Sequence, residues 1–135
     1  MVCVYCQSKL AVTNSRPQKR TNSVWRRRAC PACKSLFTTV ETVDYGSLFV
    51  YNRPGSPIEP FSETKLLISV YEACKHRKSP EEDAKHLTDT IMHRLFTSSP
   101  GTTVQRNLVI KNVLAALRQF DKAAAVQYEA FHPNR

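Results

Sequence analysis

Four of the five cysteines fall into two pairs with the same internal spacing, Cys3 with Cys6 and Cys30 with Cys33. A spacing of two intervening residues forms a tight turn, or knuckle, that directs both sulfurs at one ion. Two such pairs can surround Zn²⁺ with four thiolates, which fills the tetrahedral shell and leaves no open position for catalysis. The alternative is redox or disulfide chemistry, but a thioredoxin-like motif needs its pair at a helix start within a βαβ unit, and that context is absent. The sequence therefore predicts one structural zinc ion per chain, bound by these four cysteines.

Basic side chains gather next to the second cysteine pair. Arg26, Arg27 and Arg28 follow one another in residues 24–29, whose composition predicts a strand that runs directly into Cys30. Because side chains alternate along a strand, Arg26 and Arg28 should share one face and Arg27 should lie on the other. A guanidinium can bind phosphate or the edge of guanine through two hydrogen bonds, and a strand fixed by a metal loses less entropy on binding.

The loop expected before this strand carries three further basic residues beside this surface, Arg16, Lys19 and Arg20. We therefore predict a DNA-contacting surface made of Arg16, Lys19, Arg26, Arg27 and Arg28. The alternative is a solvated face that only keeps a small protein soluble. Trp25, in the same strand, has two interpretations, stacking on a base or packing over a small core, and packing is favoured.

The charge of the chain is distributed unevenly. The formal net charge is +9, and residues 1–47 hold eight Lys and Arg against two acidic residues, a net +6. Residues 48–135 hold twelve against nine and are nearly balanced. A zinc ion with four thiolates carries −2, so the first segment would remain cationic at +4. This distribution indicates two modules, the first facing a polyanion, with nucleic acid the first candidate and a membrane surface the second.

The basic segment is too short and too poor in large apolar residues to fold by burial alone. A structural zinc site contributes about 10–16 kcal/mol of apparent binding free energy, which becomes folding free energy when the unfolded chain has no site. Strands are predicted over residues 11–15, 24–29 and 36–43. Together these features predict a zinc ribbon of short antiparallel strands at residues 1–46.

The pattern becomes mostly helical after residues 44–46. Strands at residues 48–53 and 58–61 predict a β-hairpin, and four stretches with helical spacing of apolar residues follow it. The predicted helix starts are Ser62 as an N-cap, Ser79 with Glu82 as a capping box, Gln105, and Asp121. The predicted fold class is therefore α+β, with a zinc ribbon followed by a second domain, residues 47–135, of a β-hairpin and about four helices.

The first module contains, in order, Ser15-Arg16-Pro17, the run from Arg26 to Cys33, and Phe37-Thr38-Thr39-Val40-Glu41. These stretches closely resemble the zinc ribbon of bacterial NrdR-type repressors of ribonucleotide reductase genes. The second module contains Gly55, Glu59-Pro60-Phe61 and Lys65, followed by Leu66-Leu67 and Ala73-Cys74. It is similar to the ATP-cone of that family, a small regulatory nucleotide-binding domain. The resemblance covers nearly the whole chain in the order of the family.

The resemblance implies a transcriptional repressor whose ribbon binds double-stranded operator DNA and whose cone senses ATP and dATP through changes in homo-oligomeric assembly. It also implies a nucleotide site at Val50, Arg53, Phe61 and Lys65, in which Arg53 and Lys65 bind phosphate and the other two border the base. The chain departs from the family at residues 52–55, where Asn-Arg-Pro-Gly replaces a pair of cations followed by Asp-Gly. We predict nucleotide binding with altered affinity or selectivity, and the alternative is a cone reduced to an assembly domain.

The ribbon departs from the family at Gln7 and Lys34, which follow the two knuckles where the family usually has glycine. A residue other than glycine held at positive φ costs about 1–2 kcal/mol. That cost is small against the zinc contribution, so we expect the metal site to be retained.

Two functional hypotheses from different classes follow. The first is a nucleotide-responsive repressor that binds DNA, and the second is a zinc-ribbon interaction module for RNA or a protein, whose cone serves only for assembly. An enzyme is not expected, because no nucleophile, general base or open metal site can be named. The longest apolar run has six residues and no charged leader precedes one, so neither a membrane span nor a secretion signal is expected. The predicted location is the bacterial cytoplasm, with nucleoid association when DNA is bound.

Overall fold

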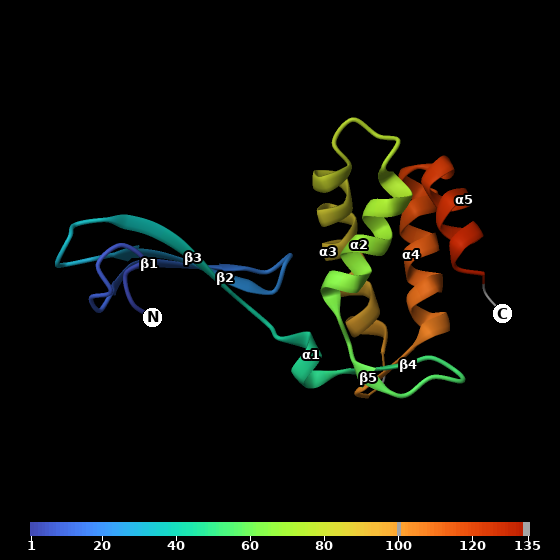
Figure 1. The fold of residues 1–135 in the computed structure, drawn as a ribbon, viewed down its shortest axis with the longest axis horizontal. Helices are drawn as coiled ribbons and strands as arrows, with labels where there is room; N and C mark the ends of the chain where they lie inside the picture. Colours follow the sequence, from blue (N-terminus) through green and yellow to red (C-terminus); the bar gives the residue numbers. More distant parts are fainter. Residues whose placement is uncertain (100, 134–135) are drawn as a thin grey trace. The chain divides into compact units, whose positions relative to one another are not determined.

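The computed structural model describes residues 1–99 and 101–133 (Figure 1). The chain divides into two compact units, Met1–Val43 and Asp44–Arg135. The division falls slightly before the boundary expected at residues 46 and 47. In the described part of the chain, no helix is both long and apolar enough to cross a membrane.

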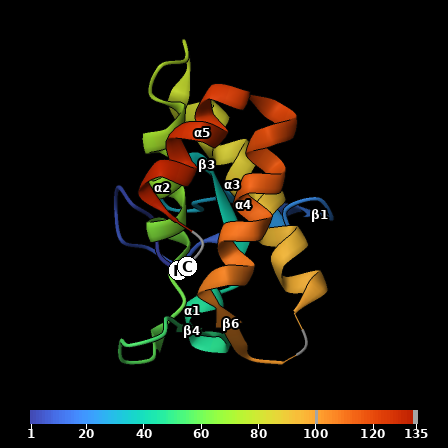
Figure 2. The ribbon, with the colours of Figure 1, turned by 90° about the vertical axis from the view of Figure 1, so that its right-hand side faces the viewer.

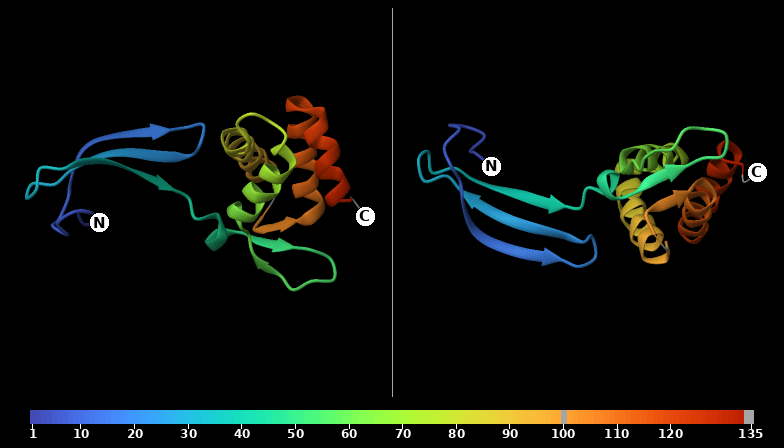
Figure 3. Two further views of the ribbon diagram at one scale, coloured as in Figure 1. Left: turned by 45° about the horizontal axis from the view of Figure 1, so that its top comes forward. Right: turned by 90° about the horizontal axis from the view of Figure 1, so that it is seen from below.

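The first unit is a three-stranded antiparallel sheet built from β1 (Ala11–Gln18), β2 (Ser23–Ala29) and β3 (Leu36–Thr42). The strands lie in the order β1-β2-β3, so the arginine-rich strand is central (Figure 3). A bulge between Val12 and Asn14 interrupts the β1–β2 register. Strand β1 is longer than predicted, so Arg16 lies in the strand opposite Trp25 and not on a loop. Strand propensity alone gave no reason to continue β1 through Pro17, but Pro17 lies on an edge strand, where a missing N–H is tolerated.

The second unit begins with a one-turn helix and a small sheet. Helix α1 (Tyr45–Leu48) precedes β4 (Val50–Asn52) and β5 (Glu59–Pro60), which pair antiparallel as the predicted hairpin. A third strand, β6 (Thr103–Gln105), pairs parallel to β4, giving the order β5-β4-β6. Neither α1 nor β6 was predicted, because segments of three or four residues are too short to show a period.

Four helices form the body of this unit, and the predicted α+β fold class is confirmed. They are α2 (Glu63–Cys74), α3 (Pro80–Ser98), α4 (Arg106–Phe120) and α5 (Lys122–Phe131). Helix α2 packs on α3 and α5, and α4 packs on the same two helices (Figure 2). The apolar stripes of all four meet in one core, whose fully buried side chains include Val70, Ile91, Leu95, Val113 and Leu117.

The helix starts follow the predicted signals with one exception. The Ser62 hydroxyl accepts a hydrogen bond from the Lys65 backbone N–H at 3.2 Å, as expected of an N-cap. The predicted capping box at the start of α3 is wrong, because the Ser79 side chain forms no capping bond there in the described structure. Helix α3 starts instead with Pro80, and three acidic residues in its first turn complement the helix dipole.

Asp121 caps α5 and also joins two other segments. Its carboxylate accepts hydrogen bonds from the backbone N–H groups of Ala123 at 2.8 Å and Ala124 at 3.1 Å. It also accepts from Arg77 at 2.8 Å, and Arg77 donates a second bond to Asp83 at 2.6 Å. The Arg77 guanidinium, followed by the Ala124 N–H, holds the pKa of Asp121 well below its usual range. One ion-pair network therefore fixes the α2–α3 connection to the starts of α3 and α5.

Candidate functional site

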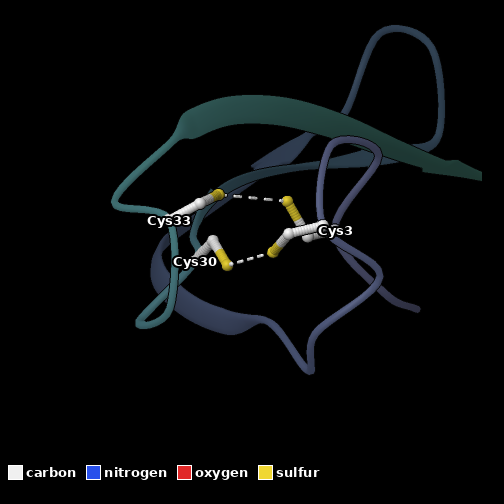
Figure 4. A group of neighbouring side chains, drawn as sticks. Cys3, Cys30 and Cys33 are labelled. Atoms are coloured by element: carbon white, nitrogen blue, oxygen red, sulfur yellow. Dashed lines mark hydrogen bonds between the residues drawn. The ribbon is translucent and has the colours of Figure 1, made fainter.

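The four predicted metal ligands lie together at one end of the ribbon. Their sulfurs are all within 4.8 Å of one another. The Cys3 and Cys33 sulfurs are 3.6 Å apart and the Cys6 and Cys30 sulfurs 3.4 Å apart, so the two knuckles face each other across the site (Figure 4). Four sulfurs about 2.3 Å from a zinc ion lie about 3.8 Å from one another in a tetrahedron. The donor set and its spacing therefore fit one structural zinc ion.

The two knuckles share one backbone hydrogen-bond pattern. In each, the first cysteine donates its N–H to the carbonyl five residues later, and the residue four positions later donates back to the cysteine carbonyl. The four bonds, each 2.8 to 3.0 Å long, are Cys3 N to Ser8 O, Gln7 N to Cys3 O, Cys30 N to Ser35 O, and Lys34 N to Cys30 O. This repetition gives the site its internal symmetry.

Gln7 and Lys34 occupy equivalent places in these knuckles. Both have a φ of 62°, which confirms the prediction that residues other than glycine are held there in the left-handed region. Each costs about 1–2 kcal/mol relative to an ordinary backbone conformation. The zinc contribution of about 10–16 kcal/mol exceeds the sum of both costs.

The surroundings of the sulfurs shift the pKa values of Cys3 and Cys30 in opposite directions. The Ser35 hydroxyl, 3.4 Å from the Cys3 sulfur, and the Cys6 backbone N–H lower the pKa of Cys3 to about 6. The Cys33 backbone N–H acts in the same direction on Cys30, but burial and the Cys6 sulfur outweigh it and raise the pKa of Cys30 to about 11. Neighbouring sulfurs in so small a volume repel as anions, and a divalent ion removes that repulsion.

The central strand β2 places the three arginines as their alternation predicts. On one face, Arg26 donates to Glu41 at 3.2 Å and Arg28 donates its Nε–H to Thr39 at 2.7 Å. On the other face, Arg27 lies opposite Thr38 and approaches its hydroxyl at 3.4 Å. The two faces of the sheet therefore differ in one respect: Arg26 pairs with a carboxylate, whereas Arg27 and Arg28 both contact threonine hydroxyls.

The remaining predicted DNA-contacting residues lie on β1 and the turn after it. Arg16 is exposed, and its guanidinium carbon lies 6.0 Å from the centre of the Trp25 ring. Trp25 is half-buried, between Arg16 on β1 and Val40 on β3. Lys19 is exposed in the turn between β1 and β2. The sheet thus places Arg16 on the same face as Arg27, opposite Trp25, and leaves Lys19 at the end of the strands.

The second unit contains a cavity of about 660 Å³ bordered by the β4–β5 hairpin, α2, α4 and α5. Of the predicted nucleotide-site residues, Arg53, Phe61 and Lys65 line it. Val50 is not among the described lining residues, whereas Tyr51, the next residue of β4, is, because successive side chains of a strand point to opposite faces of the sheet. A volume of this size suits a small-molecule ligand, for which cavities of about 300–1,000 Å³ are usual.

Two of the predicted nucleotide-site residues, Lys65 and Phe61, already have partners within the chain. Lys65 pairs with Glu59 at 2.8 Å, and both side chains are largely exposed. Phe61 is buried, with its ring edge-on to Phe96 at a centroid distance of 5.4 Å. Phe61 therefore contributes part of the cavity wall from within the core.

The cavity also includes residues that the sequence analysis missed. Arg106 lines it from the first residue of α4, and it donates to the Pro133 carbonyl at 3.3 Å. His132 stacks on Tyr128 with ring centroids 4.2 Å apart and lies 3.2 Å from the Ser69 hydroxyl. Burial raises the pKa of Tyr128, so the phenol is neutral at the cavity wall. The missed strand β6 places Arg106 here, so no local signal in the sequence could have found it.

The chain is similar to known transcriptional repressors over nearly its whole length. The family model of the transcriptional repressor NrdR-like N-terminal domain matches residues 1–41. A protein named transcriptional repressor NrdR from Symbiobacterium thermophilum is 37% identical over 132 residues, which are 98% of this chain and 87% of that protein. Proteins of the same name from Bifidobacterium longum and Rhodospirillum rubrum are 36% and 33% identical over 135 residues, which are 99% of this chain and 89% and 88% of theirs. The resemblance read from the motifs is thereby confirmed, and the chain belongs to the NrdR family of transcriptional repressors.

Proposed function

We propose that this protein is a nucleotide-responsive repressor that binds double-stranded operator DNA through its ribbon. The observation that carries the proposal is an arginine-rich central strand that ends at Ala29, directly before the metal ligand Cys30. Metal and sheet hold the strand rigid, so a guanidinium on it can reach a phosphate or a base edge with little loss of backbone entropy. The family resemblance adds ribonucleotide reductase genes as the regulated targets.

The cavity of the second unit is the proposed nucleotide site. Arg53, Lys65 and Arg106 give it three cations for a polyphosphate, and Tyr51, Phe61, Tyr128 and His132 give it aromatic surface for a purine. ATP and dATP are the proposed ligands. The Lys65–Glu59 pair is exposed and worth at most about 1 kcal/mol, so a phosphate can replace the carboxylate as the partner of Lys65.

Assembly is the proposed link between the two sites. One ribbon carries a formal charge of about +4 with zinc bound, which supports only weak binding to DNA. Two or more ribbons joined in a homo-oligomer gain affinity through effective concentration. A nucleotide that changes the number or spacing of subunits therefore changes repression, provided that it binds the assembly states unequally.

Duplex binding by the zinc-loaded full chain tests this proposal. We expect affinity for DNA from upstream of ribonucleotide reductase genes to fall about 10²-fold between 50 and 200 mM salt if four phosphates are contacted. Scrambled duplex DNA and single-stranded RNA of equal length are the controls. A flat salt response would favour the second candidate, an interaction module with a protein partner.

Sedimentation with ATP, dATP or neither tests the nucleotide part separately. The proposal predicts that at least one nucleotide binds in the cavity and changes the distribution of oligomers. A single distribution under all three conditions, with no nucleotide bound, would leave the cone with an assembly role only. The paired state of Lys65 is the observation that favours this second outcome.

A further inference from the structure

We propose that duplex DNA lies against one face of the ribbon sheet, the face of Arg16, Trp25 and Arg27, and that the opposite face is turned away from it. This inference rests on the proposed DNA-binding function and adds which of the five predicted basic residues contact the duplex. Arg26 and Arg28 fall on the excluded face. The reasons are the register of the sheet, the partners of each arginine and the position of one carboxylate.

The register defines the two faces. Trp25 lies opposite Arg16 on β1 and Val40 on β3, and Arg27 lies opposite Asn14 and Thr38. Because cross-strand partners project to the same side, these six residues share one face. We call it the tryptophan face.

The opposite face, which we call the glutamate face, carries the other two arginines with Glu41. Arg26 donates to Glu41 at 3.2 Å and to Ser15 at 3.4 Å, and Arg28 donates to Thr39 at 2.7 Å. An exposed ion pair is worth at most about 1 kcal/mol, so Arg26 could leave its partner. The carboxylate would remain, however, and its side chain is 65% exposed on the surface that phosphates would approach. Close approach of two anions is unfavourable, so this face is a poor match for a polyanion.

The tryptophan face has the opposite character. Over β1 to β3, all of whose residues the structure describes, it carries two guanidiniums and neither Asp nor Glu. The Trp25 ring lies near the Arg16 guanidinium, whose donors have no hydrogen-bond partner among the described residues and are available to a phosphate. Asn14 and Thr38 flank Arg27 with neutral polar groups of the kind that bind phosphate or sugar. Charge, donors and an aromatic surface therefore meet on one side.

A matched pair of substitutions tests the assignment. Arg27→Gln and Arg26→Gln remove the same charge from adjacent positions of one strand but from opposite faces. We expect Arg27→Gln to weaken duplex binding by roughly tenfold and to lower the slope of log affinity against log salt by about one. We expect Arg26→Gln and Glu41→Gln to change affinity by no more than about twofold, the effect of distant charge. Binding is measured by fluorescence anisotropy on zinc-loaded full-length protein, with zinc content determined for every variant.

The outcomes separate this inference from the function on which it rests. Equal losses in the two arginine variants, or a larger loss in Arg26→Gln, would overturn the face assignment while leaving DNA binding intact. A severalfold gain in Glu41→Gln would also overturn it, because the carboxylate would then face the duplex. Failure of the unaltered protein to bind any duplex at low salt would instead remove the proposed function.

A second substitution on the tryptophan face keeps the inference testable if Arg27→Gln does not fold. If that variant loses zinc, Arg16→Gln decides the question, with Arg20→Gln in the exposed turn as its charge-matched control. The inference requires a roughly tenfold loss for Arg16→Gln and at most about twofold for Arg20→Gln. Similar losses in both would contradict it.

Discussion

The ribbon and the helical unit are held together in different ways. Among residues 1–43 the buried ones are Cys3, Ser23 and Cys30, and every residue of β1 is exposed. In the helical unit, four apolar stripes meet in a continuous core whose central side chains have no exposed surface. The ribbon therefore depends on its metal and the helical unit on burial, although both belong to one chain of ordinary composition. The comparison shows that a strand carrying several guanidiniums can be held in place by a metal site without an apolar core beneath the strand.

Removal of zinc is the strongest way to break this comparison. Cys30→Ser, or a chelator that strips the metal, should unfold the ribbon, because about 10–16 kcal/mol of folding free energy is lost. The helical unit should keep its helices and its cooperative melting transition. Zinc content, far-UV circular dichroism and proteolysis of the first 43 residues measure the two effects.

Cys74→Ala is the matched control, since Cys74 lies in the helical core and not at the metal. It should keep one zinc per chain and lower the stability of the helical unit instead. A ribbon that stayed folded and protease-resistant without zinc would contradict the metal-dependent half of the comparison.

A substitution that removes a buried side chain from the helical core tests whether that unit depends on burial. Leu117 is fully buried on α4, and Leu117→Ala should destabilise the helical unit by about 2–5 kcal/mol. Zinc content should not change. The control is Leu36→Ala, since Leu36 is 58% exposed in the ribbon and its truncation should cost no more than about 0.5 kcal/mol. Chemical denaturation is followed by helical signal for the Leu117 variant and by the fluorescence of Trp25, in the ribbon, for the Leu36 variant. Equal effects of the two substitutions would show that burial does not distinguish the units.

The two units also differ in how far their sites follow from sequence. The metal site could be predicted because its ligands form two local pairs, and local spacing is sufficient to build each knuckle. The alternation of Arg26, Arg27 and Arg28 was predictable for the same reason. The cavity depends on contacts between distant segments, and its residue Arg106 reaches the site only because β6 pairs with β4. Strands of three residues are too short to show an alternation of apolar and polar residues, and their parallel pairing has no local sequence signal. The residues that line the cavity were therefore only partly predicted.

Secondary structure shows the same contrast. The helices from Ser62 and Asp121 were predictable from their caps, and the structure forms both capping bonds. The start at Ser79 had the right sequence and no capping bond, because Pro80 and the acidic first turn are sufficient to begin the helix. A cap motif thus located the helix correctly while misassigning the interaction that starts it.

The cavity proposed to bind nucleotide provides a prediction whose expected effect is of intermediate size. Arg106→Gln removes one of three cations and should weaken ATP or dATP binding by about tenfold, within the 1–3 kcal/mol of a charged hydrogen bond. The affinity of the ribbon for DNA should not change when the two proteins are compared in the same oligomeric state. The control is Lys111→Gln on the same helix, because Lys111 is exposed and does not line the cavity.

Calorimetric titration with each nucleotide measures this effect, with thermal unfolding as a check on folding, because Arg106 also bonds to the Pro133 carbonyl. Unchanged nucleotide affinity in a folded Arg106→Gln variant would place the ligand away from α4. Equal losses in both variants would indicate long-range charge and not a contact.

The smallest predicted effect is on the strained backbone of the second knuckle. Lys34 is held at a φ of 62°, so Lys34→Gly should relieve about 1–2 kcal/mol of strain and lose about 0.5–1 kcal/mol to the greater freedom of glycine in the unfolded chain. The net gain of about 0.5–1 kcal/mol should appear as zinc binding that is about two- to fivefold tighter in chelator competition. Lys34→Ala is the control, because it removes the same charge but keeps a Cβ at positive φ, and it should bring no gain. An equal gain in zinc affinity in the alanine variant would show that the loss of the lysine charge causes the effect. The backbone strain at residue 34 would then have no measurable influence on zinc binding.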